Sequence, residues 1–590
     1  MLIINTTSKV VTFFTGQSRQ SKTFWFSLSL VFATIYGLLA IQQAFSSDYV
    51  VQDDARQHIF WMQRYLDPDL FPGDLIADYF QAVAPMGYAG LYKVMAALGI
   101  EPDFFSKILP LFLGLITAGY CFVLSLEIFP IPLSAFISSI LFSQSLWCSN
   151  ELSSGTPRAF LYPLLLAFLY YLLRQSRLIC LILIGLQVIF YPAISLISLG
   201  LVAIRLIYWK DRKISLSENW KDYLLFAGGF CLVLGLVLYT KSLSEFGPIV
   251  TRSEAVTMPE FQVGGRNAFF RPGIDYWLGG RSGIFHGATF TPVTLTAGLA
   301  LPLLLGLPVK TKVRKQVSSS IYILLQLLLT SLILYSLAHL LLFQLHLPNR
   351  YPGHTIRIIS AITSGISWTI ILDDTFRFCK IWRSKRKAVS LRLISTFSQI
   401  LPLALTIILL ITIFFYYPLF IKNFPKAGYL DFSNAQSIYE FFATQPKNIL
   451  IASLSGEADN LQTFSARSVL VSREHSYAYH KGYYTQIRQR AEDLISAQYS
   501  DDPSTLLRFI QAYDIDFWLL DKNAFTDAYI SENSWLNQFQ PMANDAASSL
   551  KQSINPILKQ SIGACTVLDT LDWFILDADC IHEFASASRP

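Results

Sequence analysis

The sequence predicts a polytopic α-helical membrane protein with a C-terminal α/β domain outside the membrane. Hydrophobic residues make up 53% of the 590 residues and charged residues only 15%, and the mean hydropathy is +0.42. A soluble protein of this size would need more charge to cover its surface. Long apolar runs recur as far as residue 421, and a more polar segment follows them. Lys and Arg gather in short segments between the apolar runs, so we expect no nucleic-acid partner.

The N-terminal segment, residues 1–23, is polar and carries Lys9, Arg19 and Lys22. The apolar run that follows, 24–45, is long enough to span a bilayer, whereas the core of a cleaved signal peptide is shorter. The sequence therefore predicts a cytoplasmic N-terminal segment followed by a signal anchor.

The region 24–421 is expected to be the transmembrane domain. A helix crosses the hydrocarbon core with roughly 20 apolar residues, which predicts about eleven spans. The expected spans are 24–45, 109–128, 131–147, 157–173, 178–190, 193–208, 223–240, 289–308, 318–344, 358–374 and 394–421. The fifth and sixth are short and are separated by Tyr191-Pro192, which predicts a tight hairpin shielded by neighbouring protein.

Basic residues in the connections predict the orientation. Four basic loops, near 174–177, 210–213, 310–315 and 377–387, fall on the side of the N-terminus if every expected segment spans. Because basic loops stay in the cytoplasm, this predicts a cytoplasmic N-terminus and a C-terminus on the outer side. The expected outer segments are 46–108, 148–157, 241–288, 345–357 and the tail, 422–590.

The tail has the pattern of a small α/β domain with a partly parallel sheet. Short β-rich runs at 447–453, 467–472 and 516–521 alternate with helical patterns at 483–499 and 504–513. Two further β-rich runs, 566–568 and 573–576, are expected to form a closing hairpin. Cys565 and Cys580 flank this hairpin, where a disulfide and two unpaired thiols both fit the sequence. We expect the tail to pack over the membrane domain and shape its entrance.

The first outer loop carries the acidic candidates for catalysis. Asp53, Asp54 and His58 directly follow the first span. If a helix begins near Asp53, Asp54 and His58 share one face, with about 5–6 Å between their Cβ atoms. A carboxylate and an imidazole there can bind a divalent cation or take a proton from an attacking hydroxyl. The alternative is that Asp53 or Asp54 only caps an interfacial helix.

The other outer loops are rich in cationic residues. Arginine binds phosphate oxygens with a bidentate fork, and glycines such as those of the two Gly-Gly-Arg repeats (264–266 and 279–281) let the backbone approach an anion. This predicts a lipid phosphate or pyrophosphate ligand at the outer interface, although each arginine alone could pair with lipid headgroups or tail acids. The candidate binding residues are Arg158, Arg266, Arg281, Arg350, His354 and Arg357.

The sequence from Asp53 to His58, together with the topology, resembles the type C (GT-C) superfamily of membrane glycosyltransferases. Members have many spans, an acidic motif just after the first helix and, in many cases, an outer soluble domain. The topology matches over the whole chain and the motif over a few dozen residues. The signature WWD of oligosaccharyltransferase catalytic subunits is not present. The tail resembles that of an uncharacterised bacterial branch of this superfamily.

The resemblance implies transfer of a sugar from a polyprenyl-phosphate donor to a glycan, lipid or protein acceptor, by inversion or retention. It implies that Asp54, or next Asp53, is the general base, and that these acids and His58 could hold Mg²⁺ or Mn²⁺. Outer arginines and histidines would bind the donor phosphate, with Arg350, His354 and Arg357 first. It also implies a bacterial plasma (inner) membrane protein with a periplasmic tail.

Two other functions are considered. A transporter or lipid flippase predicts facing acids within the spans and an internal repeat, and the sequence shows neither. A non-catalytic envelope assembly protein would need outer loops but no acid pair beside arginines. An enzyme predicts that Asp53 or Asp54 and several outer arginines converge on one cavity open to lipid and water.

Overall fold

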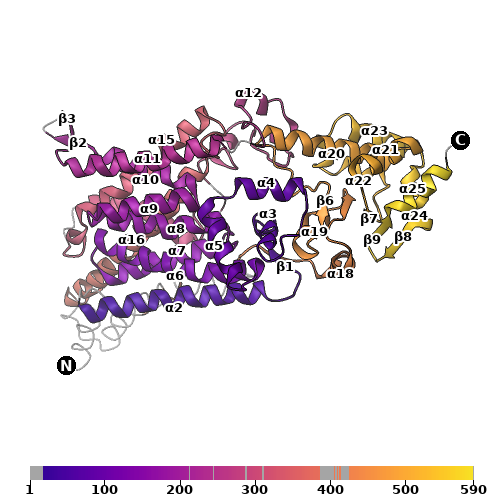
Figure 1. Cartoon of the computed structure of the whole chain (residues 1–590). Helices are drawn as coiled ribbons and strands as arrows, with labels where there is room; N and C mark the ends of the chain where they lie inside the picture. The colour runs from indigo at the N-terminus through magenta and orange to yellow at the C-terminus, as the bar shows by residue number, and fades with distance from the viewer. Residues whose placement is uncertain are drawn as a thin grey trace.

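The computed structural model of the chain describes residues 18–210, 213–242, 245–285, 287, 289–307, 311–385, 404, 408, 411–412 and 424–588. A bundle of long helices, which lie side by side in Figure 1, forms one half of the molecule, and the tail forms the other. The bundle consists of α2 (Arg19–Ala44), α6 (Pro102–Ile128), α7 (Pro132–Trp147), α8 (Leu161–Leu173), α9 (Arg177–Phe190), α10 (Pro192–Arg205), α11 (Trp220–Ser242), α14 (Leu301–Gly306), α15 (Tyr322–Leu340) and α16 (Arg350–Lys385).

Apolar composition identifies the membrane-spanning helices. Five are long and apolar enough to cross a membrane: Arg19–Ala44, Pro102–Ile128, Trp220–Tyr239, Ser319–Leu340 and Arg350–Thr375. Shorter apolar helices cover 157–173, 177–190, 192–205 and 293–306, and α7, with every residue buried, packs against α2, α6 and α16. The expected span 394–421 lies outside the described residues, apart from four of them. The chain is thus a polytopic helical protein, and the count of about eleven spans remains a prediction.

The helix break at Tyr191-Pro192 is confirmed. Helix α9 ends just before this pair, α10 begins at Pro192, and the two helices pack against each other. Proline has no amide hydrogen to donate and so suits the first turn of α10, where that hydrogen would have no partner within the helix. Tyr191 therefore sits at a hairpin tip between two short apolar helices.

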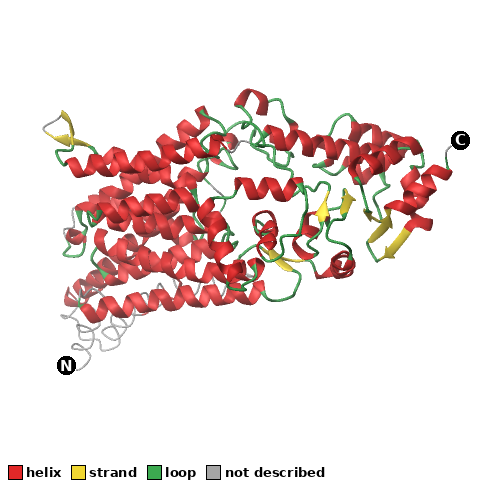
Figure 2. Cartoon of the chain, in the orientation of Figure 1, coloured by secondary structure: helices red, strands yellow, loops and turns green. Residues whose placement is uncertain are grey.

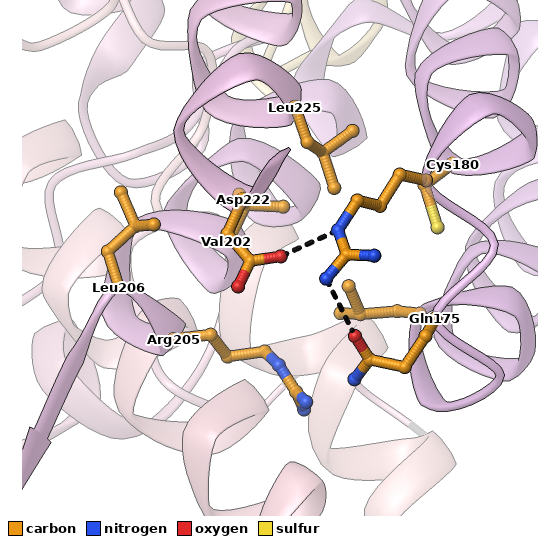
Figure 3. Close-up of a pocket in the computed structure, with 9 residues that line it drawn as sticks. Gln175, Cys180, Val202, Arg205, Leu206, Asp222 and Leu225 are labelled. Atoms are coloured by element: carbon orange, nitrogen blue, oxygen red, sulfur yellow. Dashed lines mark hydrogen bonds and ion pairs between the residues drawn. The ribbon is translucent and has the colours of Figure 1, made fainter. Parts of the chain in front are cut away.

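Basic loops gather at one end of the bundle, which we call the basic end. Arg177 donates to Asp222 Oδ1 at 2.7 Å and to Gln175 Oε1 at 3.2 Å, across a small pocket in which Arg205 also lies (Figure 3). Arg174 pairs with Glu127 at 3.4 Å, and Arg314 pairs with Asp374. The segments near 174–177, 314–315 and 374–377 thus meet at the end opposite the tail, as the predicted topology requires.

The remaining elements of the membrane half are short. They are β1 (Val50–Gln52), α3 (Ala55–His58), η1 (Phe60–Tyr65), α4 (Leu75–Val83), α5 (Met86–Ala97), η2 (Pro157–Phe160), β2 (Ile207–Lys210), β3 (Lys213–Leu216), α12 (Arg252–Ala255), η3 (Pro259–Phe261), α13 (Asp275–Leu278), η4 (Val293–Ala300), η5 (Arg314–Gln316) and η6 (Ser319–Ile321). Strands β2 and β3 form a hairpin at the basic end, far from the other strands in Figure 2. Strand β1 pairs antiparallel with β4 (Tyr429–Asp431), which ties the first loop to the start of the tail.

The tail is built on a five-stranded sheet of order β6-β5-β7-β9-β8. Strands β6 (Ser468–Val469), β5 (Leu450–Ser453) and β7 (Phe517–Asp521) are parallel, and β9 (Trp573–Asp577) pairs antiparallel with β7 and with β8 (Thr566–Asp569). The predicted mixed sheet is confirmed. The tail helices are η7 (Ser433–Ala435), α18 (Gln436–Thr444), α19 (Ala458–Phe464), α20 (Lys481–Tyr499), α21 (Pro503–Tyr513), α22 (Asp527–Ser531), η8 (Leu536–Gln538), α23 (Met542–Lys551), α24 (Ile557–Cys565) and α25 (Ala578–Ala587).

A disulfide closes the hairpin of β8 and β9. Cys565 and Cys580 are bonded with 5.4 Å between their Cα atoms, so the structure resolves the alternative that the sequence leaves open. Cross-linking a loop of this length stabilises a fold by about 3 kcal/mol, mainly by restricting the unfolded chain.

We expect the double variant Cys565→Ala/Cys580→Ala to lose about 3 kcal/mol of tail stability for that reason. Unfolding of the full-length protein, followed by tryptophan fluorescence in detergent, measures the loss. Cys231→Ala is the control, because Cys231 is an exposed free thiol in α11. An unchanged transition in the double variant would show that the bond does not contribute.

Candidate active site

A cavity of about 490 Å³ lies where the bundle, the first loop and the tail meet. The first loop lines it with Asp54 and His58 from the α3 region and with aromatic and apolar residues of α4. Further walls come from η2, from the α9–α10 turn and from the segment before α16. The lining residues are Asp54, His58, Tyr79, Phe80, Val83, Thr156, Pro157, Arg158, Tyr191, Ile249, Arg281, Phe343, Gln344, His346, Leu347, Arg350, Tyr477, Tyr479 and His480.

Asp54 presents its carboxylate to this cavity. It occupies the N-cap position of α3, but its side chain makes no cap hydrogen bond. The carboxylate instead pairs with Arg158 of η2, whose side chain is 12% exposed. The backbone amide of Asp54 donates a hydrogen bond to Gln52 Oε1 at 2.8 Å. Asp54 is therefore oriented by an arginine, and the interpretation as a simple helix cap does not describe it.

His58 follows one turn after Asp54 and lines the same cavity, as the spacing predicts. Burial lowers the pKa of His58 to about 4, with Asp54 raising it and Arg158 lowering it further. The imidazole is thus neutral at pH 7 and can donate one hydrogen bond and accept another. It suits the orientation of a hydroxyl better than the binding of an anion.

Two further arginines reach the cavity from different parts of the chain. Arg281, in the loop between α11 and η4, donates from Nη1 to Tyr479 Oη at 2.8 Å. Arg350 begins α16, and its Nε and Nη1 are buried without a hydrogen-bond acceptor among the described residues. Buried guanidinium hydrogens that lack an acceptor are costly, so an anionic ligand in the cavity would satisfy them.

The tail forms one wall of the cavity. Tyr477, Tyr479 and His480 lie just before α20 and line it. His480 Nδ1 and Tyr79 Oη are 2.9 Å apart, and the rings of Tyr79 and Tyr483 stack with 3.7 Å between their centroids. The tail therefore shapes the cavity directly, in agreement with its expected packing over the membrane half.

The tail is held in place by a buried polar interface with the first loop and with the loop between α11 and η4. Arg56 donates to Asn460 Oδ1 at 3.0 Å, Gln57 donates to Glu474, and Arg266 pairs with Glu474 at 3.0 Å. Burial raises the pKa of Glu474 to about 7, against the lowering effect of Arg266 and Arg56. These contacts fix the position of Tyr477 and Tyr479 at the cavity wall.

A buried ionic network lies beneath Arg158. Glu151, with a side chain that is 1% exposed, accepts hydrogen bonds from Arg357 Nη1 at 3.0 Å and from Tyr162 Oη at 2.5 Å, and lies 3.2 Å from His354 Nδ1. Burial raises the pKa of Glu151, but Arg357, His354 and Arg158 outweigh burial and hold the pKa well below its usual range. Asp54 and Glu151 both raise the pKa of Arg158 through their negative charges, against the lowering effect of burial.

Comparison with solved structures finds partial similarity to two membrane proteins. The archaeal oligosaccharyltransferase AglB from Archaeoglobus fulgidus, in complex with an inhibitory peptide and a dolichol-phosphate, is 12% identical, with a TM-score of 0.47 over 88% of this chain and 72% of that one. ArnT from Cupriavidus metallidurans bound to undecaprenyl phosphate is 12% identical, with a TM-score of 0.45 over 94% and 98%.

Both TM-scores are below 0.5. At these values the likeness transfers no superfamily, residue role or substrate to this chain. No family model and no curated protein matches the sequence.

Four of the predicted site residues lie outside the cavity lining. Asp53 turns toward Arg56, at 2.5 Å, and is 46% exposed, while Arg266 is bound by Glu474. Of the three residues predicted first to bind the donor phosphate, Arg350, His354 and Arg357, only Arg350 lines the cavity. The spacing does place the three residues near one face of α16, but each turn advances about 5.4 Å along the axis. His354 and Arg357 therefore lie deeper in the bundle, on Glu151.

The residues expected to bind Mg²⁺ or Mn²⁺ do not form a three-ligand site. Asp54 and Asp53 each pair with an arginine. Among the residues that the structure describes, no three His, Cys, Asp or Glu side chains are placed to hold a metal ion. The donor set of Asp53, Asp54 and His58 thus does not fit the cation.

Proposed function

We propose that this protein transfers a sugar from a polyprenyl-phosphate-linked donor to an acceptor at the outer face of a bacterial plasma membrane. The observation that carries the proposal is the convergence of Asp54, His58, Arg158, Arg281 and Arg350 on one cavity. An apolar wall that includes Val83, Phe343 and Leu347 suits a lipid chain. The orientation follows from the basic end, which we assign to the cytoplasm.

The chemistry follows from the arrangement of charges. Asp54 accepts the proton of the acceptor nucleophile as that atom bonds to the anomeric carbon of the donor sugar. The bond between this carbon and the phosphate oxygen breaks, and its electron pair leaves with the lipid phosphate. Arg281 and Arg350 bind the phosphate and stabilise the charge that develops on it. Arg158 holds the Asp54 carboxylate in position, and neutral His58 orients the acceptor.

The direct test is donor consumption by purified protein in lipid nanodiscs, using a panel of radiolabelled polyprenyl-phosphate sugars together with an envelope lipid and glycan extract as acceptor. We expect release of the lipid phosphate from one class of donor. If folded protein consumes no donor with acceptor present, the enzymatic proposal is wrong, and a non-catalytic role in envelope assembly takes its place.

We expect Arg350→Gln to raise the KM for the donor by about ten- to a hundredfold, because a hydrogen bond to a charged group contributes about 1.5–3 kcal/mol. Steady-state kinetics with the consumed donor measures this effect. Arg252→Gln is the control: Arg252 lies on the loop that carries Arg281 but is exposed and does not line the cavity. Equal KM changes in the two variants would show that only the general field of positive charge matters.

A further inference from the structure

The loop between α11 and η4 exposes an apolar segment at 274–278. Ile274 is 70% exposed, Trp277 52% and Leu278 42%, and α13, which spans Asp275–Leu278, has no buried residue. Three large apolar side chains in five residues are unusual on a surface that faces water. Such a patch indicates a contact with lipid or with another molecule.

This segment is held against the last turns of the membrane-spanning helix α15. Tyr335 Oη donates to Ser282 O at 3.0 Å, and His339 Nε2 lies 2.9 Å from the same carbonyl oxygen. The rings of Trp277 and His339 have centroids 5.2 Å apart. Because a helix rises 1.5 Å per residue, Tyr335 lies about 7 Å inside the end of α15 at Leu340. The segment therefore lies level with the end of a span.

The apolar surface of α15 continues into the segment. At the same end of α15, Leu337 is 39% exposed, Leu340 72% and Leu341 47%. In a spanning helix these side chains face lipid, and the boundary between hydrocarbon and headgroups is where Trp is enriched. Arg271, exposed just before the segment, can reach lipid phosphates from there.

We propose that Ile274, Trp277 and Leu278 insert into the lipid leaflet on the tail side of the membrane and anchor this loop beside α15. The occupant of the patch is thus the bilayer and not a protein partner. This inference does not depend on the proposed enzymatic activity. The anchored segment is close to the cavity, because Arg281, three residues after Leu278, lines the cavity wall. The neighbouring Gly280 accepts a hydrogen bond on its carbonyl oxygen from Asn349 Nδ2 at 3.0 Å.

Site-specific fluorescence tests the insertion. Leu278→Cys, and separately Ile274→Cys, is made in a Cys231→Ala/Cys379→Ala background and labelled with an environment-sensitive fluorophore. Among the remaining cysteines, Cys121, Cys148 and Cys180 are buried and Cys565 and Cys580 are bonded, so the new thiol takes the label. The full-length protein is placed in phosphatidylcholine nanodiscs whose lipids carry bromine high on the acyl chains.

Two controls bracket the result. Leu340→Cys, on the spanning helix, reports lipid exposure, and Val263→Cys reports water exposure. Val263 is 71% exposed in the same loop, close to the Arg266 amide that binds Gln538 of the tail. We expect the labels at 274 and 278 to lose most of their emission to the brominated lipid, as at 340, and to resist iodide in the water.

Labels at 274 and 278 that behave like the label at 263, quenched by iodide and not by bromine, would overturn the proposal. That outcome would make the patch a water-facing docking surface. Quenching at only one of the two positions would likewise contradict insertion of the segment as a unit.

Discussion

Asp54→Asn is expected to lower donor turnover by about 10²–10⁴-fold, the usual contribution of a general base. The amide is the same size as the carboxylate and still faces Arg158, so the cavity keeps its shape while it loses its proton acceptor. Loss of released lipid phosphate in a single-turnover assay measures the effect. The expected change is in kcat, because Asp54 acts on the acceptor proton and not on the donor phosphate.

Asp53→Asn is the matched control for this substitution. Asp53 is the adjacent carboxylate, but it pairs with Arg56 and is 46% exposed outside the cavity lining. We expect its turnover to stay close to that of the unmodified protein. Unchanged turnover in both variants would remove the catalytic assignment, whereas equal loss in both would indicate a shared structural effect of the acidic pair.

Glu151→Gln is expected to destabilise the protein by about 3–5 kcal/mol, because removing one member of a buried ion pair leaves the other charge uncompensated. Arg357 and Glu151 are each 1% exposed, and Glu151 also stabilises the positive charge of Arg158 electrostatically. Thermal unfolding in detergent, followed by intrinsic fluorescence, measures the change. Because Arg158 pairs with Asp54, we expect activity to fall together with stability.

Two further variants separate this effect from a general loss of charge. Glu127→Gln removes a carboxylate that pairs with the exposed Arg174 at the basic end, where we expect a change of at most about 1 kcal/mol. The double variant Glu151→Gln/Arg357→Met removes both buried charges and should recover part of the lost stability. A double variant less stable than Glu151→Gln would show that Arg357 does not depend on Glu151 for its burial.

Local patterns predicted most of the secondary structure. Strands β5, β7 and β9 are buried β-rich runs, and the mixed sheet follows from their alternation with helices. The pairing of β1 with β4 was not predicted, since it joins Val50 to Asp431, two segments that only the folded tail brings together. A helix as short as α13, with four residues, shows no helical period in the sequence.

The site residues were predicted only where a local sequence pattern brings them together. The spacing of Asp54 and His58 places them together because both belong to one turn of helix. The same reasoning fails for His354 and Arg357, since spacing gives a face of α16 but not the depth at which the cavity ends. Glu151 and Tyr477 were missed, because neither belongs to a periodic pattern near Asp54, although an acid seven residues before Arg158 was a usable signal.

The most direct test of the central claim is an experimental structure of the protein in lipid nanodiscs with a polyprenyl phosphate. The account predicts phosphate density within hydrogen-bond distance of Arg281 and Arg350, beside Asp54, with the lipid chain along Val83, Phe343 and Leu347. Ordered phosphate bound elsewhere, with the cavity closed or filled by water alone, would contradict the account.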